Sequence, residues 1–176
     1  GKLGERILFI TDKGLISLGL TEPTIKELQK NGSVEVFDDV EADPSQKTLL
    51  NAIEIGKKIK ATGVIGFGGG SSMDVAKLSA LILGSNENLD EAWGVANAKG
   101  PRLPLVLIPT TAGTGSEVTP ISIITVGEEE KKGVSSSLIL PDLAILDPEL
   151  TLGLPASTTE STGIDAMVHA IEGFAS

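Results

Sequence analysis

The chain has 176 residues, and its 14 Lys and Arg against 24 Asp and Glu give a formal net charge of −10. An acidic protein repels nucleic-acid phosphates at long range, so we expect no nucleic-acid partner. The absence of cysteine excludes disulfides and cysteine-ligated metal sites. No apolar run approaches the roughly 18 residues of a membrane span, so we expect a cytoplasmic protein with no membrane partner.

Short apolar runs alternate with helical patterns along the first part of the chain. Strands are predicted over residues 7–10, 34–37 and 64–67, each a short and mainly apolar run. The first run is continuous, as expected of a strand buried on both faces of a sheet. Helices are predicted over 22–30 and 45–60, where apolar residues recur at helical spacing. This alternation is typical of right-handed βαβ units, so the predicted fold class is α/β with a parallel sheet.

The rest of the chain extends the same pattern. The predicted elements are a helix through Leu83, a strand over 103–108, a strand pair over 121–126 and 136–139, and a last strand over 143–146. The charge run between the paired strands, which contains Lys131, is typical of a solvated hairpin turn. From Thr158 onward the apolar residues again have helical spacing, which predicts a terminal helix.

Three consecutive glycines, Gly68 to Gly70, join a predicted strand to a predicted helix. Residues without Cβ let the backbone approach a ligand closely, and Ser71 or Ser72 would cap a helix whose N-terminus favours an anion. A phosphate group suits this arrangement. A tight turn without a ligand is an equal alternative, because the spacing matches neither the dinucleotide nor the Walker pattern. Asp74, in the first helical turn, is explained most simply by the helix dipole.

A second turn, after the strand predicted over 103–108, is rich in hydroxyl side chains and glycine. Its hydroxyl residues are Thr110, Thr111, Thr114 and Ser116. The carboxyl ends of parallel strands meet at one edge of the sheet, so this turn and the glycine turn could face one extended ligand such as a dinucleotide. A hydroxyl-capped loop is the alternative. Asp12 ends the first strand, where an aspartate can bind a ribose or simply form a turn.

Asp165 and His169 are four residues apart on the predicted terminal helix. They therefore lie on one face and could hold one metal ion, since oxygen and imidazole donors suit Fe(II), Zn or Mn. An ion pair on the helix surface is the commoner explanation of this spacing. The sequence has no other histidine, so further ligands would be carboxylates, water or residues beyond this chain.

Four blocks of sequence together resemble the iron-containing (group III) alcohol dehydrogenases. The blocks are GGGSSMDVAK at 68–77, PTTAGTGSEVT at 109–119, LPDLAILDPELT at 140–151 and TGIDAMVHAIE at 162–172. The resemblance implies a Rossmann-like parallel-sheet domain over residues 1–150 that lacks the family's N-terminal strand and helix. It also implies that residues 151–176 begin an all-helical metal-binding domain. We therefore expect the sequence to be a fragment of a longer enzyme.

The resemblance assigns site residues one by one. Gly69, Gly70 and Ser71 match the turn that binds the pyrophosphate of NAD. Asp12 matches the aspartate that contacts the adenosine ribose and disfavours NADP. The four hydroxyl residues of the second turn match the segment along the adenine and nicotinamide ends of the coenzyme.

Other matched positions concern the nicotinamide and the metal. Lys131 matches a lysine near the nicotinamide ribose, and Asp74 falls near the nicotinamide. Asp165 and His169 match two of the four ligands of Fe(II), with Zn as an alternative, and the family's helical domain supplies two further histidines. Asp43 departs from the pattern, because members of the family often have asparagine at this adenosine-side position.

By this resemblance the complete enzyme transfers a hydride reversibly between NAD(H) and an alcohol, aldehyde or ketone. The full-length form is expected to be a homo-oligomer. The chain alone is expected to bind NAD weakly and to be inactive, because half of the metal ligands are missing. Two alternatives are a non-catalytic nucleotide-binding fragment and an NAD-using lyase of the dehydroquinate synthase type. The block over 110–117 and the helix over 163–172 favour the dehydrogenase.

Overall fold

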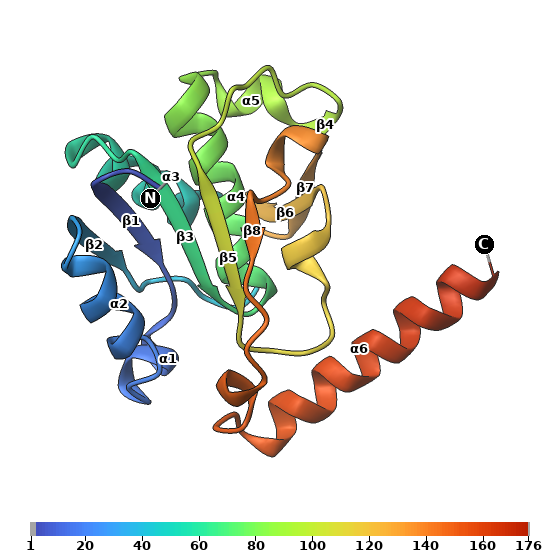
Figure 1. Cartoon of the computed structure of the whole chain (residues 1–176). Coiled ribbons are helices and arrows are strands. Elements are labelled where there is room, and N and C mark those ends of the chain that lie inside the picture. The colour runs from blue at the N-terminus through green and yellow to red at the C-terminus, as the bar shows by residue number, and fades with distance from the viewer. Residues whose placement is uncertain (1–2, 176) are drawn as a thin grey trace.

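The computed structural model describes residues 3–175 and has a five-stranded parallel sheet with helices on both faces (Figure 1). The strands are β1 (Arg6–Ile10), β2 (Ser33–Phe37), β3 (Gly63–Gly68), β5 (Leu105–Pro109) and β8 (Leu143–Ala144), in the order β2-β1-β3-β5-β8. Every neighbouring pair in this sheet is parallel. The predicted α/β fold class is therefore confirmed.

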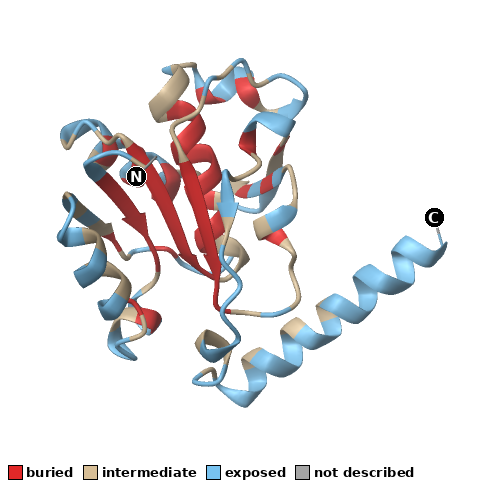
Figure 2. Ribbon diagram, in the orientation of Figure 1, coloured by how far each residue is buried: buried red, intermediate tan, exposed pale blue. Residues whose placement is uncertain are grey.

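Four helices cover the two faces of this sheet. They are α1 (Lys13–Ser17), α2 (Glu22–Gln29), α3 (Gln46–Lys58) and α4 (Gly70–Ser85). Alternate residues of β1 point to opposite faces, so Leu8 and Ile10 join the core under α3 and α4, while Ile7 and Phe9 join the core under α1 and α2. Figure 2 shows the central strands and α4 almost entirely buried. This double burial explains why β1, β3 and β5 are mainly apolar in sequence.

A smaller sheet packs against α4. Its strands are β4 (Gly94–Val95), β6 (Ile121–Val126) and β7 (Glu130–Ser135), in the order β4-β7-β6, and the short helix α5 (Leu89–Ala92) precedes it. Strands β6 and β7 are antiparallel. Ile124 and Val134 are buried in the core shared with α4, so this sheet encloses the outer side of that helix.

Two strand predictions in the second half of the chain were wrong. The second strand of the pair was predicted over 136–139, but the strand is β7, and residues Ser137–Ile139 form a 3-10 helix. β7 has one solvated face, so it needs no apolar run, and its charged residues lie in the strand and not in a turn. The strand predicted over 143–146 is only the two-residue β8, because β8 is the last strand of the sheet and pairs on one side only.

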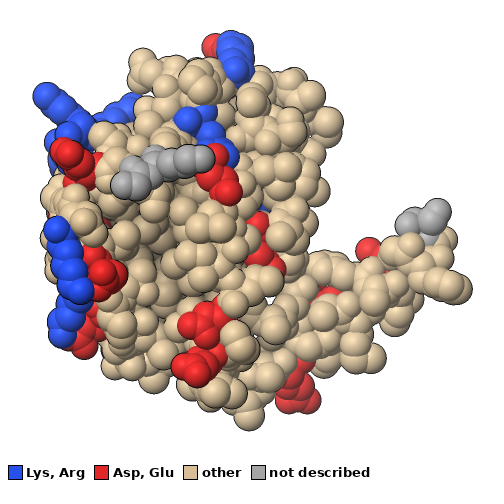
Figure 3. All heavy atoms as spheres, in the orientation of Figure 1, with Lys and Arg blue, Asp and Glu red and all other residues tan. Residues whose placement is uncertain are grey.

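The terminal helix α6 (Ala156–Ala175) extends away from the rest of the molecule (Figure 1). The 3-10 helix Pro148–Thr151 precedes it, and a further 3-10 helix spans Ser116–Val118. Helix α6 confirms the helix predicted from Thr158. None of its residues is buried, and Met167 and Phe174 are 64% and 94% exposed. Figure 3 shows this helix carrying acidic side chains on a surface that is otherwise uncharged. Its apolar face thus has no partner among the described residues.

Among residues 3–175, no helix combines the length and the apolar character that a membrane span needs.

Asp142 anchors the edge strand β8 to β5. One of its carboxylate oxygens accepts hydrogen bonds from the Leu105 amide at 2.8 Å and from the Arg102 guanidinium at 2.7 Å. The hydrogen bond from Arg102 is the main cause that holds the pKa of Asp142 below its ordinary value. An acid with a lowered pKa in the folded state stabilises the fold above its unfolded pKa, and this contribution disappears as the pH falls through the folded pKa.

Replacing Asp142 by alanine is therefore expected to lower the free energy of unfolding by about 1 kcal/mol near neutral pH, since the carboxylate is partly exposed and screened. The difference from the parent chain should shrink toward about pH 3. Urea unfolding, followed by the fluorescence of the single tryptophan Trp93, measures the difference in the free energy of unfolding at each pH. An equal difference at the two pH values would contradict the role assigned to the carboxylate.

Candidate functional site

The strand order places a topological switch point between β1 and β3. The chain passes from β1 to β2 on one side and then crosses to β3 on the other side of β1. In open α/β sheets, ligands bind outside the carboxyl ends of the strands at such a point. Asp12 follows β1 here, and Gly68 ends β3. A Cβ on Gly68 would lie 3.3 Å from the Leu15 side chain, so the two chain segments are in contact.

The glycine turn, residues 68–71, leads directly from β3 into α4. Gly68 has a φ of 151°, which a side chain would strain, and Gly69 is the N-cap of α4. Ser71 or Ser72 was predicted to cap the helix, and this was wrong: α4 begins at Gly70, so both serines lie in its first turn. Because a glycine cap offers no side-chain acceptor, the first amides of α4 are free to bind an anion.

The hydroxyl-rich loop, residues 110–117, lies against the glycine turn. The Thr110 amide donates to the Gly68 carbonyl at 3.0 Å. A Cβ on Gly69 would lie 3.7 Å from the Thr111 hydroxyl oxygen, and one on Gly70 would lie 3.2 Å from the Thr114 methyl carbon. The sheet thus brings together two turns that are far apart in the sequence.

One hydroxyl in this loop has no partner in the part of the chain that the structure describes. The Thr111 Oγ1 atom is buried and makes no hydrogen bond within residues 3–175. A buried hydroxyl without a partner costs free energy, which a ligand can recover by binding to it. A dinucleotide fits the residues present, since Gly69 leaves space for a diphosphate beside the helix N-terminus and Thr111 offers an unused hydroxyl next to that space.

Asp74 and Ser116 lie just below these turns, in hydrogen bonds within the chain. The Ser116 hydroxyl donates to Asp74 Oδ1 at 2.8 Å, and the Ile123 amide donates to Asp74 Oδ2 at 2.9 Å. Burial raises the pKa of the Asp74 carboxyl, while the charge of Lys77 opposes that shift. Asp74 and Ser116 therefore connect α4 to the loop and to β6.

Lys77 is the residue of this cluster that the sequence did not single out. Its side chain is fully buried, and Nζ lies 3.5 Å from Asp74 Oδ1. Burial is the largest influence on the pKa of Lys77 and lowers it, and Asp74 acts in the opposite direction. A lysine inside the apolar helix that follows the glycine turn was the signal that could have found it, because lysine is rarely buried without a partner.

Asp12 and Lys131 each have a partner in the structure. Asp12 caps α1, since its Oδ1 accepts from the Leu15 amide at 3.0 Å, as a turn-forming aspartate does. The Lys131 ammonium pairs with Asp43 Oδ1 at 2.6 Å, and both side chains are exposed. Asp43 has a φ of 52°, a left-handed conformation that asparagine also tolerates. The structure thus links Lys131 to the loop before α3.

Asp165 and His169 lie on one face of α6, as their spacing predicts. His169 Nε2 is 3.6 Å from Asp165 Oδ1, and both side chains are about half exposed. No group of three His, Asp or Glu side chains that could hold a metal is found within residues 3–175. The pair supplies one oxygen and one imidazole donor, so it fits part of a metal site whose other ligands come from elsewhere.

Gly113 places α6 against the hydroxyl-rich loop. A Cβ on Gly113 would lie 2.1 Å from the carbonyl oxygen of Thr162. Thr162 precedes Asp165 by less than one turn of the helix. The loop beside the glycine turn therefore touches the helix that carries the Asp165 and His169 pair.

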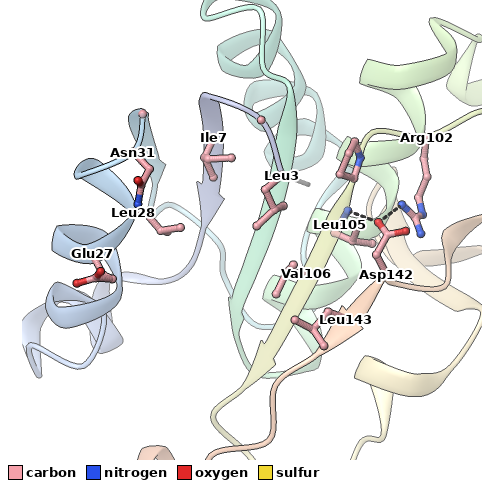
Figure 4. Close-up of a pocket in the computed structure, with 13 residues that line it drawn as sticks. Leu3, Ile7, Glu27, Leu28, Asn31, Arg102, Leu105, Val106, Asp142 and Leu143 are labelled. Atoms are coloured by element: carbon pink, nitrogen blue, oxygen red, sulfur yellow. Dashed lines mark hydrogen bonds and ion pairs between the residues drawn. The ribbon is translucent and has the colours of Figure 1, made fainter. Parts of the chain in front are cut away.

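A large cavity lies at the opposite edge of the sheet. It has a volume of about 880 Å³ and opens between α2 and the amino ends of β1, β5 and β8 (Figure 4). Apolar side chains such as Ile7, Leu28 and Leu143 line it, and the Arg102 and Asp142 pair closes one side. None of the predicted site residues lines this cavity, so it is separate from the candidate site.

Comparison with known proteins places the chain in a family. A model of the family described as iron-containing alcohol dehydrogenase matches residues 1–148. The chain is 41% identical to long-chain-alcohol dehydrogenase 1 of Geobacillus thermodenitrificans, over 99% of this chain and 45% of that protein. It is 38% identical to sulfoacetaldehyde reductase of Bilophila wadsworthia, over 97% of this chain and 45% of that protein.

Solved structures agree. The iron-containing alcohol dehydrogenase of Thermotoga maritima has a TM-score of 0.88 and 40% identity, over 98% of this chain and 48% of that one. Sulfoacetaldehyde reductase of Bifidobacterium kashiwanohense, in complex with NAD+, has a TM-score of 0.88 and 36% identity, over 98% of this chain and 46% of that one. The chain thus spans a little under half the length of these relatives. Because the family model matches most of its residues, the chain belongs to the iron-containing alcohol dehydrogenase family.

Proposed function

We propose that the complete protein is an NAD-dependent, metal-dependent oxidoreductase that transfers a hydride reversibly between NAD(H) and an alcohol, aldehyde or ketone. The observation that carries this proposal is the contact between the glycine turn and the hydroxyl-rich loop at the switch point. Beside it, the Thr111 hydroxyl has no partner among the described residues. The relatives support it, since they are named as alcohol dehydrogenases and an aldehyde reductase, and one is described in complex with NAD+.

The coenzyme would lie across the carboxyl ends of β1, β3 and β5. Gly69, Gly70 and Ser71 would hold the diphosphate, because their amides lie at the positive end of α4. Asp12 would bind the adenosine ribose: its cap uses Oδ1, which leaves Oδ2 to accept from a ribose hydroxyl. The same negative charge would repel the 2′-phosphate of NADP, so we propose NAD as the coenzyme.

The remaining proposed coenzyme residues belong to the loop and its surroundings. They are Asp74, Thr110, Thr111, Thr114, Ser116 and Lys131. Thr111 has the strongest support, since its hydroxyl is buried and unpaired within the described residues. The side-chain oxygens of Asp74 and Ser116 are already hydrogen-bonded within the protein, so their part would be to shape the site. Lys131 would have to leave Asp43 to reach a ribose.

We propose residues 1–150 as the NAD-binding domain and 151–176 as the start of a helical metal-binding domain. Asp165 and His169 would be two ligands of Fe(II), with Zn as an alternative. When bound, the metal supplies Lewis acidity toward the substrate oxygen. The role of this chain would be to present two metal ligands on one helix face and to hold that helix against the hydroxyl-rich loop through Gly113.

Two measurements test the proposed function. Calorimetric titration of the 176-residue chain with NAD is expected to show binding at one site, without alcohol oxidation. The complete protein loaded with Fe(II) is expected to form NADH from a panel of alcohols, and His169→Ala should remove metal and turnover together while NAD binding remains. A chain that does not bind NAD, or a complete enzyme that needs no metal, would overturn the proposal.

A further inference from the structure

Lys77 makes a complete set of hydrogen bonds inside the protein. Its side chain is fully buried in the middle of α4. Nζ donates to the Ile121 carbonyl at 2.7 Å and to Ser116 Oγ at 2.8 Å. Its third proton has Thr119 Oγ1 at 3.5 Å, with Asp74 Oδ1 at the same distance. An ammonium has three donors, so Lys77 has no donor left for a ligand.

The ammonium fixes the direction of the Ser116 hydroxyl. An ammonium can only donate, so Ser116 Oγ must accept from Lys77. The single hydroxyl proton of Ser116 must then be donated to its other close partner, Asp74 Oδ1 at 2.8 Å. Asp74 Oδ2 accepts from the Ile123 amide. We call these three side chains, Lys77, Ser116 and Asp74, the Lys77 network.

The Lys77 network lies directly beneath the two turns of the candidate site. Asp74 is one helical turn after Gly70. The Ser116 amide donates to Thr114 Oγ1 at 3.2 Å, and the methyl group of Thr114 lies against Gly70. The contacts therefore close a ring from the glycine turn through Asp74 and Ser116 to Thr114 and back. That ring connects the two turns.

We propose that Lys77 is a positioning residue for the coenzyme: its buried ammonium orients the Ser116 hydroxyl and so holds the hydroxyl-rich loop at the distance from the glycine turn that the coenzyme requires. This inference rests on the proposed function. A well-packed apolar residue can often replace a buried ion pair without loss of stability, so a lysine here is explained by the arrangement it fixes. Lys77 has no donor left for the coenzyme, so it acts through Ser116.

The test compares the parent chain with Lys77→Met. Hydrogen exchange at the Ser116 and Ile123 amides reports the position of the loop without any coenzyme, and calorimetry measures NAD affinity per folded molecule. We expect faster exchange at both amides and at least about tenfold weaker NAD binding, because charge-assisted hydrogen bonds are lost. The control is Ser79→Ala, in the same helix, whose buried hydroxyl has no partner among the described residues. It should change neither readout.

A second pair of proteins separates positioning from folding. The sequence has no cysteine, so Lys77→Cys can be alkylated with bromoethylamine in the unfolded state and refolded. This restores an ammonium on a chain of lysine length. We expect the alkylated protein to recover amide protection and NAD affinity, and the unalkylated protein to lack both. If Lys77→Met does not fold, the alkylated and unalkylated proteins are compared with Ser116→Ala, which keeps both charges but breaks the link and should loosen the loop.

The outcomes separate this inference from the proposed function. If the variants without the ammonium keep parent-like amide protection and NAD affinity, Lys77 does not position the loop and the inference is wrong. If the parent chain fails to bind NAD, the proposed function is wrong, and the inference falls with it as a statement about the coenzyme. Additive effects of Lys77→Met and Ser116→Ala on NAD affinity would also overturn it, since Lys77 would then act independently of Ser116.

Discussion

Gly69→Val is expected to weaken NAD binding by about 100-fold or more, because each 1.4 kcal/mol of lost contact is a factor of ten, while the fold stays intact. Gly69 has φ −76° and ψ −173°, a conformation that any residue adopts. A Cβ there would meet only Thr111, at an ordinary contact distance of 3.7 Å. The two methyl groups of valine would instead fill the space that we assign to the diphosphate.

Two measurements separate this effect from a change in folding. Urea unfolding should show a loss of no more than about 1 kcal/mol, the usual cost of a poorer N-cap. Gly133→Val is the matched control: Gly133 lies in β7, a Cβ there has ordinary contacts only, and valine suits a strand. That variant should bind NAD as the parent does. Undiminished NAD affinity in Gly69→Val would place the diphosphate elsewhere.

Gly113→Ala is expected to separate coenzyme binding from turnover in the complete enzyme. The new Cβ would lie 2.1 Å from the Thr162 carbonyl oxygen and 2.8 Å from the carbonyl carbon. These are backbone atoms that no side-chain rotation can move, so α6 must shift, and with it Asp165 and His169. Misplacement by about 1 Å can cost about 100-fold in rate, so kcat should fall by that order while NAD affinity changes little.

Steady-state kinetics and NAD titration of the metal-loaded enzyme check this expectation. Gly163→Ala is the control, because Gly163 follows Thr162 in α6 and a Cβ there meets nothing within 4 Å. It should keep full turnover and add up to about 1 kcal/mol of stability, since alanine favours the helix. A normal kcat in Gly113→Ala would show that the loop does not set the position of the metal ligands.

The elements that were predicted correctly are those with a strong local signal. β1, β3 and β5 are buried on both faces, so burial appears in the sequence as uninterrupted apolar runs. The helix predicted over 45–60 is α3, which begins after Ser45, whose hydroxyl accepts from the Thr48 amide at 3.2 Å. Both signals act between residues close in sequence, so the sequence alone carries them.

The elements that were missed depend on weaker local preferences or on contacts with distant residues. Helix α1 is only five residues long, and no helix was predicted directly after the strand that Asp12 ends. β7 contains Glu130, Lys131 and Lys132, which are charged enough to resemble a turn, yet pairing with β6 makes them a strand. Lys77 shows the same limit, since each of its short hydrogen bonds is to a residue in a distant part of the chain.

The sequence by itself determined the local pieces of the site: the glycine turn, the hydroxyl-rich loop, and the Asp165 and His169 pair, whose geometry follows from helical spacing. Only the tertiary structure decided which pieces meet. The glycine turn touches the hydroxyl-rich loop because β3 and β5 are neighbours in the sheet. Strand order is set by the packing of whole elements, and no short-range preference encodes it. The unpaired Thr111 hydroxyl and the buried Lys77 ammonium follow from that packing.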